Sequence, residues 1–273
     1  MFKNIFLVLL FAHILGDFYL QTETLAHRKN LWFRYVLLHS GIYAAVCLLV
    51  IVPVFSVPML LGAMAAALSH AMIDSVKYIF LRRGTGRTGE SAVYVADQLT
   101  HIALLGATAF FVTRAGESVR VISFFRPLFD VTGISASVVF SWAMILLTSW
   151  KPANVTVKRL LEAYRPSDRL VQAEIAKSGG KDERKDAREE SPDRMPGINS
   201  DEKKAGALIG LFERIIISVF LSIGQYSAIG LVLTAKSIAR YDKISKSQAF
   251  AEYYLLGTLL STAFAVVTYL LLA

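Results

Sequence analysis

Residues 1–21, MFKNIFLVLLFAHILGDFYLQ, begin as an apolar run and then carry His13, Asp17 and Gln21. In a helix, residues four apart lie one above another on a single face. Ionisable side chains are costly in lipid, so we expect these three to face a common partner. The run lacks a convincing small-residue cleavage site, which favours a membrane span over a removed secretory signal.

The composition is typical of a polytopic membrane protein. Of 273 residues, 55% are hydrophobic and 18% are charged, and the mean hydropathy is +0.50. A hydrocarbon core needs roughly 20 apolar residues for each helical span. The sequence therefore predicts an all-α transmembrane helical bundle of about seven membrane segments, near residues 3–21, 34–52, 57–81, 92–113, 133–150, 206–235 and 253–272. Cys47, the single cysteine, lies within a span and is expected to pack there.

The formal charge of +8 does not predict nucleic-acid binding, because the basic residues lie in short loops that flank apolar segments. These loops contain Arg28, Lys29 and Arg34, and then Arg82, Arg83 and Arg87. The positive-inside rule predicts that both loops face the cytoplasm and that the N-terminus lies outside. In the second half of the chain the basic residues no longer alternate, because those after the fourth span, such as Arg114 and Arg120, would face outside. A re-entrant or interfacial segment would explain this, and 206–235, with Glu213, Arg214 and Gln225, is the candidate.

The chain is expected to contain three regions. Residues 1–150 form a five-span membrane unit, 151–204 a cytoplasmic helix and charged linker, and 205–273 a two-segment membrane unit. Within the middle region, 155–177 has the apolar spacing of a helix on the membrane surface. Residues 178–204 are rich in charge, Gly and Pro, which predicts disorder.

The spacing of His13 and Asp17 recurs at His70 and Asp74, and Lys77 continues that helical face. The second span opens with His39, and the fourth carries Asp97, Gln98 and His101. Consecutive spans run antiparallel, so the end of one lies at the depth where the next begins. All four groups therefore fall at one depth, near the cytoplasmic face.

Imidazoles and carboxylates that meet in a poorly hydrated site are suitable ligands for Zn, Mn or Fe. The candidate ligands of one or two divalent ions are His13, Asp17, His39, His70, Asp74, Asp97 and His101. Asp17, Asp97 and Lys77 are the candidate catalytic residues, and Gln21, Lys77 and Gln98 the candidate substrate-binding residues. The alternative interpretation is that such residues form hydrogen bonds between helices and bind nothing.

Four motifs in order resemble a family of bacterial integral membrane proteins catalogued as domain of unknown function 3307. They are AHILGDFYLQT, LLHSGIY, LSHAMIDSVK and DQLTH, and they cover roughly residues 5–105. The resemblance implies a multi-pass protein of a bacterial inner membrane but assigns no activity. A weaker similarity links the chain to membrane-bound metal-dependent hydrolases with an H-x-x-x-H-x-x-x-D helix, although Ala66 replaces the first histidine here.

The first functional hypothesis is therefore a metal-dependent hydrolase within the membrane, acting at the cytoplasmic leaflet on a lipid-linked or phosphoester substrate. The second is an ion- or proton-coupled transporter or channel that uses the same His and Asp residues. The third is a non-enzymatic membrane scaffold. The lipid bilayer is the one partner expected in all three, and the sequence leaves the oligomeric state open.

Overall fold

The computed structural model describes residues 1–82, 87–116, 133, 135–167, 170–171, 173–175 and 200–273, except the side chains of 87–90, 136 and 200–204. The described residues contain helices and no strand. The α-helices are α1 (Phe2–Ile14), α2 (Glu23–Leu31), α3 (Phe33–Ile51), α4 (Val57–Leu81), α5 (Arg87–Arg114), α7 (Ala136–Ser149), α8 (Lys151–Leu161), α10 (Ser200–Ser222), α11 (Tyr226–Ile238), α12 (Tyr241–Lys246) and α13 (Gln248–Leu272). A π-helical segment covers Leu15–Tyr19, and short 3-10 turns cover Val52–Val54 and Glu162–Tyr164.

Six described helical segments are long and apolar enough to cross a membrane: Phe2–Tyr19, Phe33–Val54, Val57–Leu81, Ser91–Arg114, Ala205–Ser222 and Gln248–Leu272. The prediction of an all-α bundle with about seven membrane segments is confirmed, and the chain is a multi-pass membrane protein. The fifth predicted span, 133–150, contains α7, whose 14 residues are fewer than a full span needs.

The stretch 206–235, predicted as one membrane segment and as the candidate re-entrant segment, is not one continuous helix, because the chain turns at Gly224, where φ is +70°. A glycine adopts this backbone conformation without the clash that a Cβ atom causes. The result is a pair of helices, α10 and α11, which pack against each other.

In the middle region, predicted at 151–204, two boundaries also differ from the predictions. The helix expected at 155–177 begins earlier, at Lys151, and its α-helical part ends at Leu161. Of the linker predicted at 178–204, residues 178–199 lie outside the described part of the chain, and the last five begin α10.

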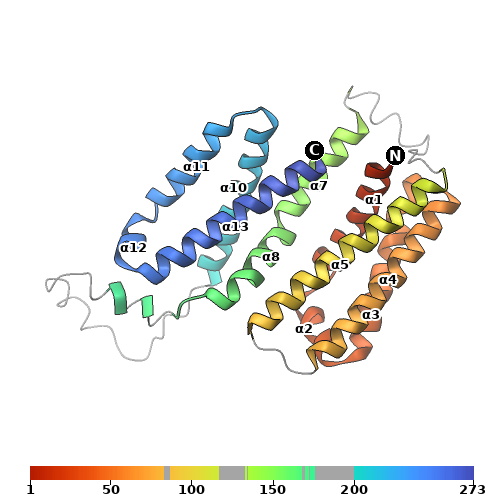
Figure 1. The fold of residues 1–273 in the computed structure, drawn as a ribbon, viewed down its shortest axis with the longest axis horizontal. Coiled ribbons are helices and arrows are strands. Elements are labelled where there is room, and N and C mark those ends of the chain that lie inside the picture. Colours follow the sequence, from red (N-terminus) through yellow and green to blue (C-terminus); the bar gives the residue numbers. More distant parts are fainter. Residues whose placement is uncertain (83–86, 117–132, 134, 168–169, 172, 176–199) are drawn as a thin grey trace. The chain divides into compact units, whose positions relative to one another are not determined.

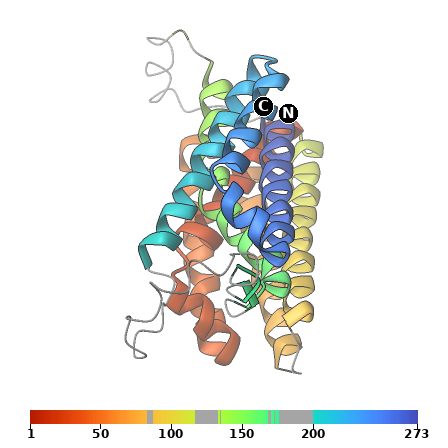
Figure 2. The same ribbon diagram turned by 90° about the vertical axis from the view of Figure 1, so that its left-hand side faces the viewer.

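The chain divides into two compact units, residues 1–152 with 272–273, and residues 153–271. In the first unit, α1 packs against α3 and α5, and α4 packs against the same two helices, as Figures 1 and 2 show. Small residues allow helices to approach closely in a membrane. At Gly62 of α4, an added Cβ atom would lie 2.8 Å from the Val112 side chain of α5, so only glycine fits.

An apolar core fills one half of this four-helix arrangement. Its members come from the start of α1 and α4 and from the end of α3 and α5: Ile5, Val8, Leu9, Ala12, Tyr43, Val46, Cys47, Ile51, Met59, Ala63, Ala66, Leu105, Ala109 and Val112. Cys47 is buried in it, as predicted. The predicted polar residues lie toward the opposite ends of the same helices, so the bundle has an apolar half and a polar half.

The π-helical segment Leu15–Tyr19 contains Asp17, and the Leu20 N–H donates to the Leu15 carbonyl at 2.9 Å. Single π turns inside helices are frequent at functional sites. The helix ends after this turn, so the prediction that Gln21 shares the helical face of His13 and Asp17 is wrong: Gln21 lies in a bend beyond the helix.

Helix α2 follows that bend and lies at one end of the first unit, where it contacts α3 and α4. Its N-terminus is capped by the Thr22 hydroxyl, which accepts a hydrogen bond from the Leu25 N–H at 3.2 Å. Glu23 in the first turn and the basic residues in the last complement the helix dipole. This helix carries Lys29, whose buried side chain turns toward the polar half of the bundle.

The second unit contains its own buried charges. Arg214 of α10 donates to Asn154 Oδ1 of α8 at 2.5 Å and to the Ser261 hydroxyl of α13 at 3.1 Å. Lys236 of α11 donates to Glu213 Oε2 at 2.6 Å. Glu213 and Arg214 are buried, as predicted, whereas Gln225 is exposed at the turn between α10 and α11.

Candidate metal centre

Asp17 joins three helices of the first unit. Its Oδ1 atom lies 2.9 Å from His39 Nε2 of α3 and 2.8 Å from His70 Nε2 of α4. A carboxylate oxygen only accepts, so both Nε2 atoms donate to it. The Nδ1 atoms of His39 and His70 are then unprotonated in the neutral rings. Both Nδ1 atoms are buried and have no hydrogen-bond partner among the described residues.

His101 of α5 presents a nitrogen that is ready to bind an electrophile. Its Nδ1 atom donates to the Asp97 carbonyl at 2.8 Å, so its Nε2 carries the lone pair in the neutral ring. That Nε2 is buried without a hydrogen-bond partner in the described part of the chain. A histidine ligand typically uses one ring nitrogen for the metal and donates the other to a carbonyl or carboxylate in this way.

The imidazole rings form one contiguous group around His70. Ring centroids lie 4.5 Å apart for His70 and His101, 5.2 Å for His39 and His70, and 5.0 Å for His13 and His101. Tyr43 of α3 stacks on His70 with centroids 3.7 Å apart and fixes the plane of that ring. All four histidines are at most 3% exposed, so the rings are held in a dry site.

Gly16 allows the first helical segment to lie close to Tyr43 of α3. A Cβ atom added to Gly16 would lie 2.6 Å from the Tyr43 ring, a distance that real Cβ atoms do not adopt. The glycine beside Asp17 therefore permits the contact that seats Tyr43 against His70.

Two ammonium groups neutralise the other two carboxylates. Lys29 Nζ lies 3.0 Å from Asp74 Oδ2 and 3.3 Å from Oδ1, and Lys77 Nζ lies 2.6 Å from Asp97 Oδ2. Gln98 Nε2 also donates to Asp97 Oδ2, at 3.2 Å. The Asp97 Oδ1 atom remains buried with no hydrogen-bond partner among the described residues.

The environment of Lys29 keeps its ammonium charged. Burial alone would lower the pKa of Lys29, but the carboxylate of Asp74, with a smaller contribution from Asp17, raises it above its ordinary value. Lys29 is therefore a fixed positive charge at neutral pH.

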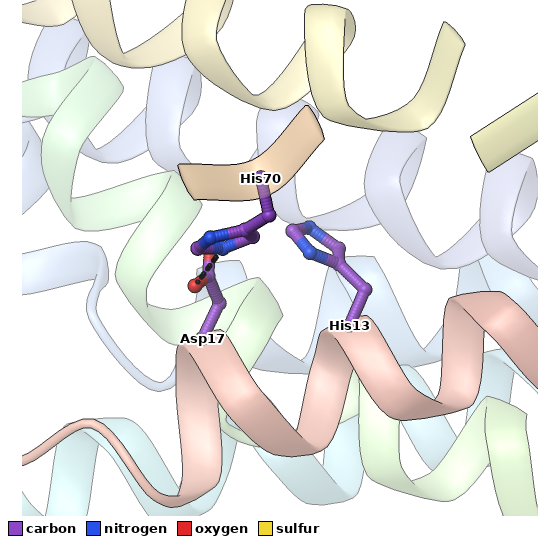
Figure 3. Close-up of side chains that lie close together, drawn as sticks. All are labelled: His13, Asp17 and His70. Carbon is purple, nitrogen blue, oxygen red and sulfur yellow. Dashed lines mark hydrogen bonds and ion pairs between the residues drawn. The ribbon is translucent and has the colours of Figure 1, made fainter. Parts of the chain in front are cut away.

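Three overlapping sets of residues bring ligand atoms within 4.8 Å of one another: His13, Asp17 and His70; His39, His70 and Asp74; and Asp74, Asp97 and His101. Figure 3 shows the first set, in which His13 and Asp17 project from one helix toward His70 of α4. In a tetrahedral zinc site with bonds of about 2.0 Å, neighbouring ligand atoms lie roughly 3.3 Å apart. The 2.8 Å between Asp17 Oδ1 and His70 Nε2 is a hydrogen bond, so His70 would offer an ion the lone pair of its Nδ1 atom.

The structure thus brings together all seven residues predicted as ligands, with Lys77 and Gln98 beside Asp97. Gln21 makes no such contact, and its Oε1 atom is buried without a hydrogen-bond partner in the described part of the chain. Sequence reasoning missed Lys29, which it assigned to a basic loop, and Tyr43, which resembles any aromatic residue of a span. The signal for Lys29 was available, since Thr22 and Glu23 mark the start of a short helix.

These features define a class: multi-pass helical membrane proteins with a buried cluster of histidines and aspartates. Residues 5–127 match the family model described as "Protein of unknown function (DUF3307)", which confirms the resemblance that the four motifs indicated. No curated protein and no solved structure matches the chain.

Proposed function

We propose that this protein is a metal-dependent hydrolase within the membrane, and that its histidine and aspartate cluster holds a divalent cation. The convergence of ligand atoms from His13, Asp17 and His70 carries this proposal. The substrate we infer is a lipid-linked compound with a phosphoester or comparable bond, reached at the cytoplasmic leaflet. Zn, Mn and Fe are the candidate ions, because each accepts imidazole together with carboxylate ligands.

The state of the ring nitrogens supports the choice of a cation as ligand. A buried polar atom without a hydrogen bond costs about 1–3 kcal/mol, so several in one place require an explanation. Here the buried atoms without a partner among the described residues include His13 Nε2, His39 Nδ1, His70 Nδ1 and His101 Nε2. Lone pairs on neutral imidazoles are what a Lewis acid needs.

The same cluster contains groups suited to hydrolysis. A bound divalent ion would polarise the scissile group and activate a water molecule. The buried Asp97 Oδ1, which has no hydrogen-bond partner among the described residues, is an acceptor for the proton of the attacking water. As the water oxygen bonds to the phosphorus or carbonyl carbon, the bond to the leaving oxygen breaks, and that oxygen takes up the proton that Asp97 accepted from the water. Lys77 and Gln98, which both contact Asp97, are placed to orient an anionic substrate group.

The apolar half of the bundle favours an enzyme over a transporter. An ion pathway needs polar groups at intervals through the membrane. In the described helices, the half opposite the cluster is filled by the apolar core that includes Leu9, Ile51, Met59 and Val112. Polar groups confined to one half of the bundle suit a reaction at one leaflet better than a path through the membrane.

Metal analysis of the detergent-purified protein tests this proposal. We expect wild-type protein to retain stoichiometric metal, and His70→Ala to lose most of it while remaining folded by circular dichroism. His27→Ala is the matched control, because His27 is exposed on α2 and outside the cluster. Metal-replete wild-type protein without bound metal would refute the proposal.

Activity is measured separately, with a long-chain p-nitrophenyl phosphodiester in mixed micelles. Hydrolysis should depend on added metal and disappear in His70→Ala. Ion flux into proteoliposomes that depends on Asp17, without hydrolysis, would instead identify a transporter.

A further inference from the structure

The three candidate ligand sets differ in one respect that decides how many ions the cluster holds. The sets that contain Asp74 include a carboxylate bound to Lys29, and the set that also contains Asp97 includes a second one bound to Lys77. Among the described residues, no lysine forms an ion pair with the set of His13, Asp17 and His70. One ligand set is therefore available, and the others are already engaged by ammonium groups.

The side chains of both lysines, like those of the aspartates that they contact, are largely buried. The Lys29 side chain is 8% exposed and that of Asp74 is 2% exposed, while Lys77 and Asp97 are 18% and 3% exposed. Separating such a pair without replacing the partner leaves a buried charge, which is strongly unfavourable. A metal ion that binds Asp74 or Asp97 would therefore have to displace the ammonium group of Lys29 or Lys77.

Charge balance leads to the same conclusion. The cluster contains three negative charges, from Asp17, Asp74 and Asp97, and the two lysines contribute two positive charges. With neutral histidines, the cluster is left with a single negative charge. One divalent ion then gives a small net charge, whereas two ions would leave an excess of three positive charges in a site of low dielectric.

We propose that Lys29 and Lys77 occupy the position of a second cation and restrict the cluster to one divalent metal ion, bound by His13, Asp17 and His70. This inference rests on the proposed function and deepens it, since it separates a mononuclear from a dinuclear centre. Lys29 and Lys77 act here as specificity-determining residues for metal number. Asp74 and Asp97 then remain free of metal, and Asp97 is left to accept a proton.

The test is the number of metal ions bound per chain. Full-length protein is loaded with excess Co²⁺, desalted and analysed by mass spectrometry of the metal. We expect about one ion per wild-type chain and about a twofold increase in Lys29→Met/Lys77→Met, which keeps side-chain length but removes both charges. Arg28→Met is the control: Arg28 is exposed on the same helix and bonds to the Tyr35 hydroxyl, so its loss should change nothing.

Each outcome has a distinct meaning. Two ions in wild-type protein, or one in a folded double variant, would overturn the role of the lysines while leaving the metal site intact. No bound ion in wild-type protein would overturn the proposed function itself. If the double variant does not fold, wild-type protein loaded with Mn²⁺ decides by electron paramagnetic resonance. An isolated-ion spectrum supports the inference, and an exchange-coupled pair refutes it.

Discussion

The two units of the molecule each bury charged side chains, but they do so with different chemistry. In the first unit the cluster contains four imidazoles, and ring nitrogens of all four lack a hydrogen-bond partner among the described residues. In the second unit Arg214 is bound to Asn154 and Ser261, and Lys236 to Glu213. The sequence contains no histidine after His101, so the second unit offers no nitrogen ligand.

This difference shows that burial of charge alone does not identify a functional site in a membrane protein. A guanidinium cannot ligate a metal, but it can donate to several helices at once. We therefore interpret the Arg214 network as a connection between helices α8, α10 and α13, and the histidine cluster as a binding site. The predictions below distinguish residues that bind metal from residues that only stabilise the fold.

Asp17→Ala should cause the largest change. It removes a ligand and leaves the donors of His39 and His70 without their acceptor, which costs about 1–3 kcal/mol for each group. We expect metal content to fall more than tenfold and thermal stability in detergent to fall moderately. Asp242→Ala is the control, since Asp242 is 78% exposed in a surface ion pair. Metal retention in the Asp17 variant would place the ion elsewhere.

Arg214→Met should show the opposite pattern. Removing one partner from a buried charged network costs about 3 kcal/mol or more, so the variant should unfold at a clearly lower temperature. Its metal content per folded chain should equal that of wild type, because the second unit supplies no imidazole ligand. Arg240→Met, at an exposed position, should change neither quantity. Loss of metal without loss of stability would contradict the interpretation of this network as structural.

Gly16→Ala tests how tightly the cluster depends on packing. The new methyl group would meet the Tyr43 ring at 2.6 Å and force it to shift against His70. Overpacking of this kind costs about 1–3 kcal/mol, and the displaced His70 should weaken metal binding several-fold. Gly106→Ala is the matched control, because a Cβ atom there meets nothing within 4 Å. Isothermal titration with Zn²⁺ and thermal unfolding measure the two effects.

Tyr43→Phe should have the smallest effect. The hydroxyl contacts His13 Nδ1 only at 3.5 Å, whereas the ring that stacks on His70 is retained. We expect a loss of less than about 1 kcal/mol in stability and nearly unchanged metal content. Tyr43→Leu, which removes the stacked ring, should weaken metal binding more than Tyr43→Phe does. Equal behaviour of the two variants would show that the ring does not position His70.

Much of the polar half could be predicted because its signals are local and rare. A histidine and an aspartate four apart in an apolar run are unusual, and the alternation of span direction places such pairs at one depth. The partners of these residues were not predictable in this way. Lys77 pairs with Asp97 of the next helix and not with its own helical neighbours, which only the packing of α4 against α5 decides.

The features that the sequence predictions missed or placed wrongly have physical causes of the same kind. From the sequence, Lys29 resembles the other basic residues of a loop. The helix that carries it has nine residues, which is too short to give a clear periodic pattern. The four-residue spacing placed Gln21 on the face of Asp17, but the backbone changes its pitch at Leu15–Tyr19 and the helix ends there. The break inside 206–235 had a signal in Gly224, which the long apolar stretch concealed.

The wide turn at Leu15–Tyr19 has a consequence for how related chains should be compared. Such a turn accommodates one residue more than an ordinary helical turn, and here it is the last turn before the chain bends at Leu20 and Gln21. A relative that lacks this extra residue could hold the same two side chains in the same place with an interval of three between them. Pattern searches that insist on an interval of four would overlook it, whereas superposition in space would not.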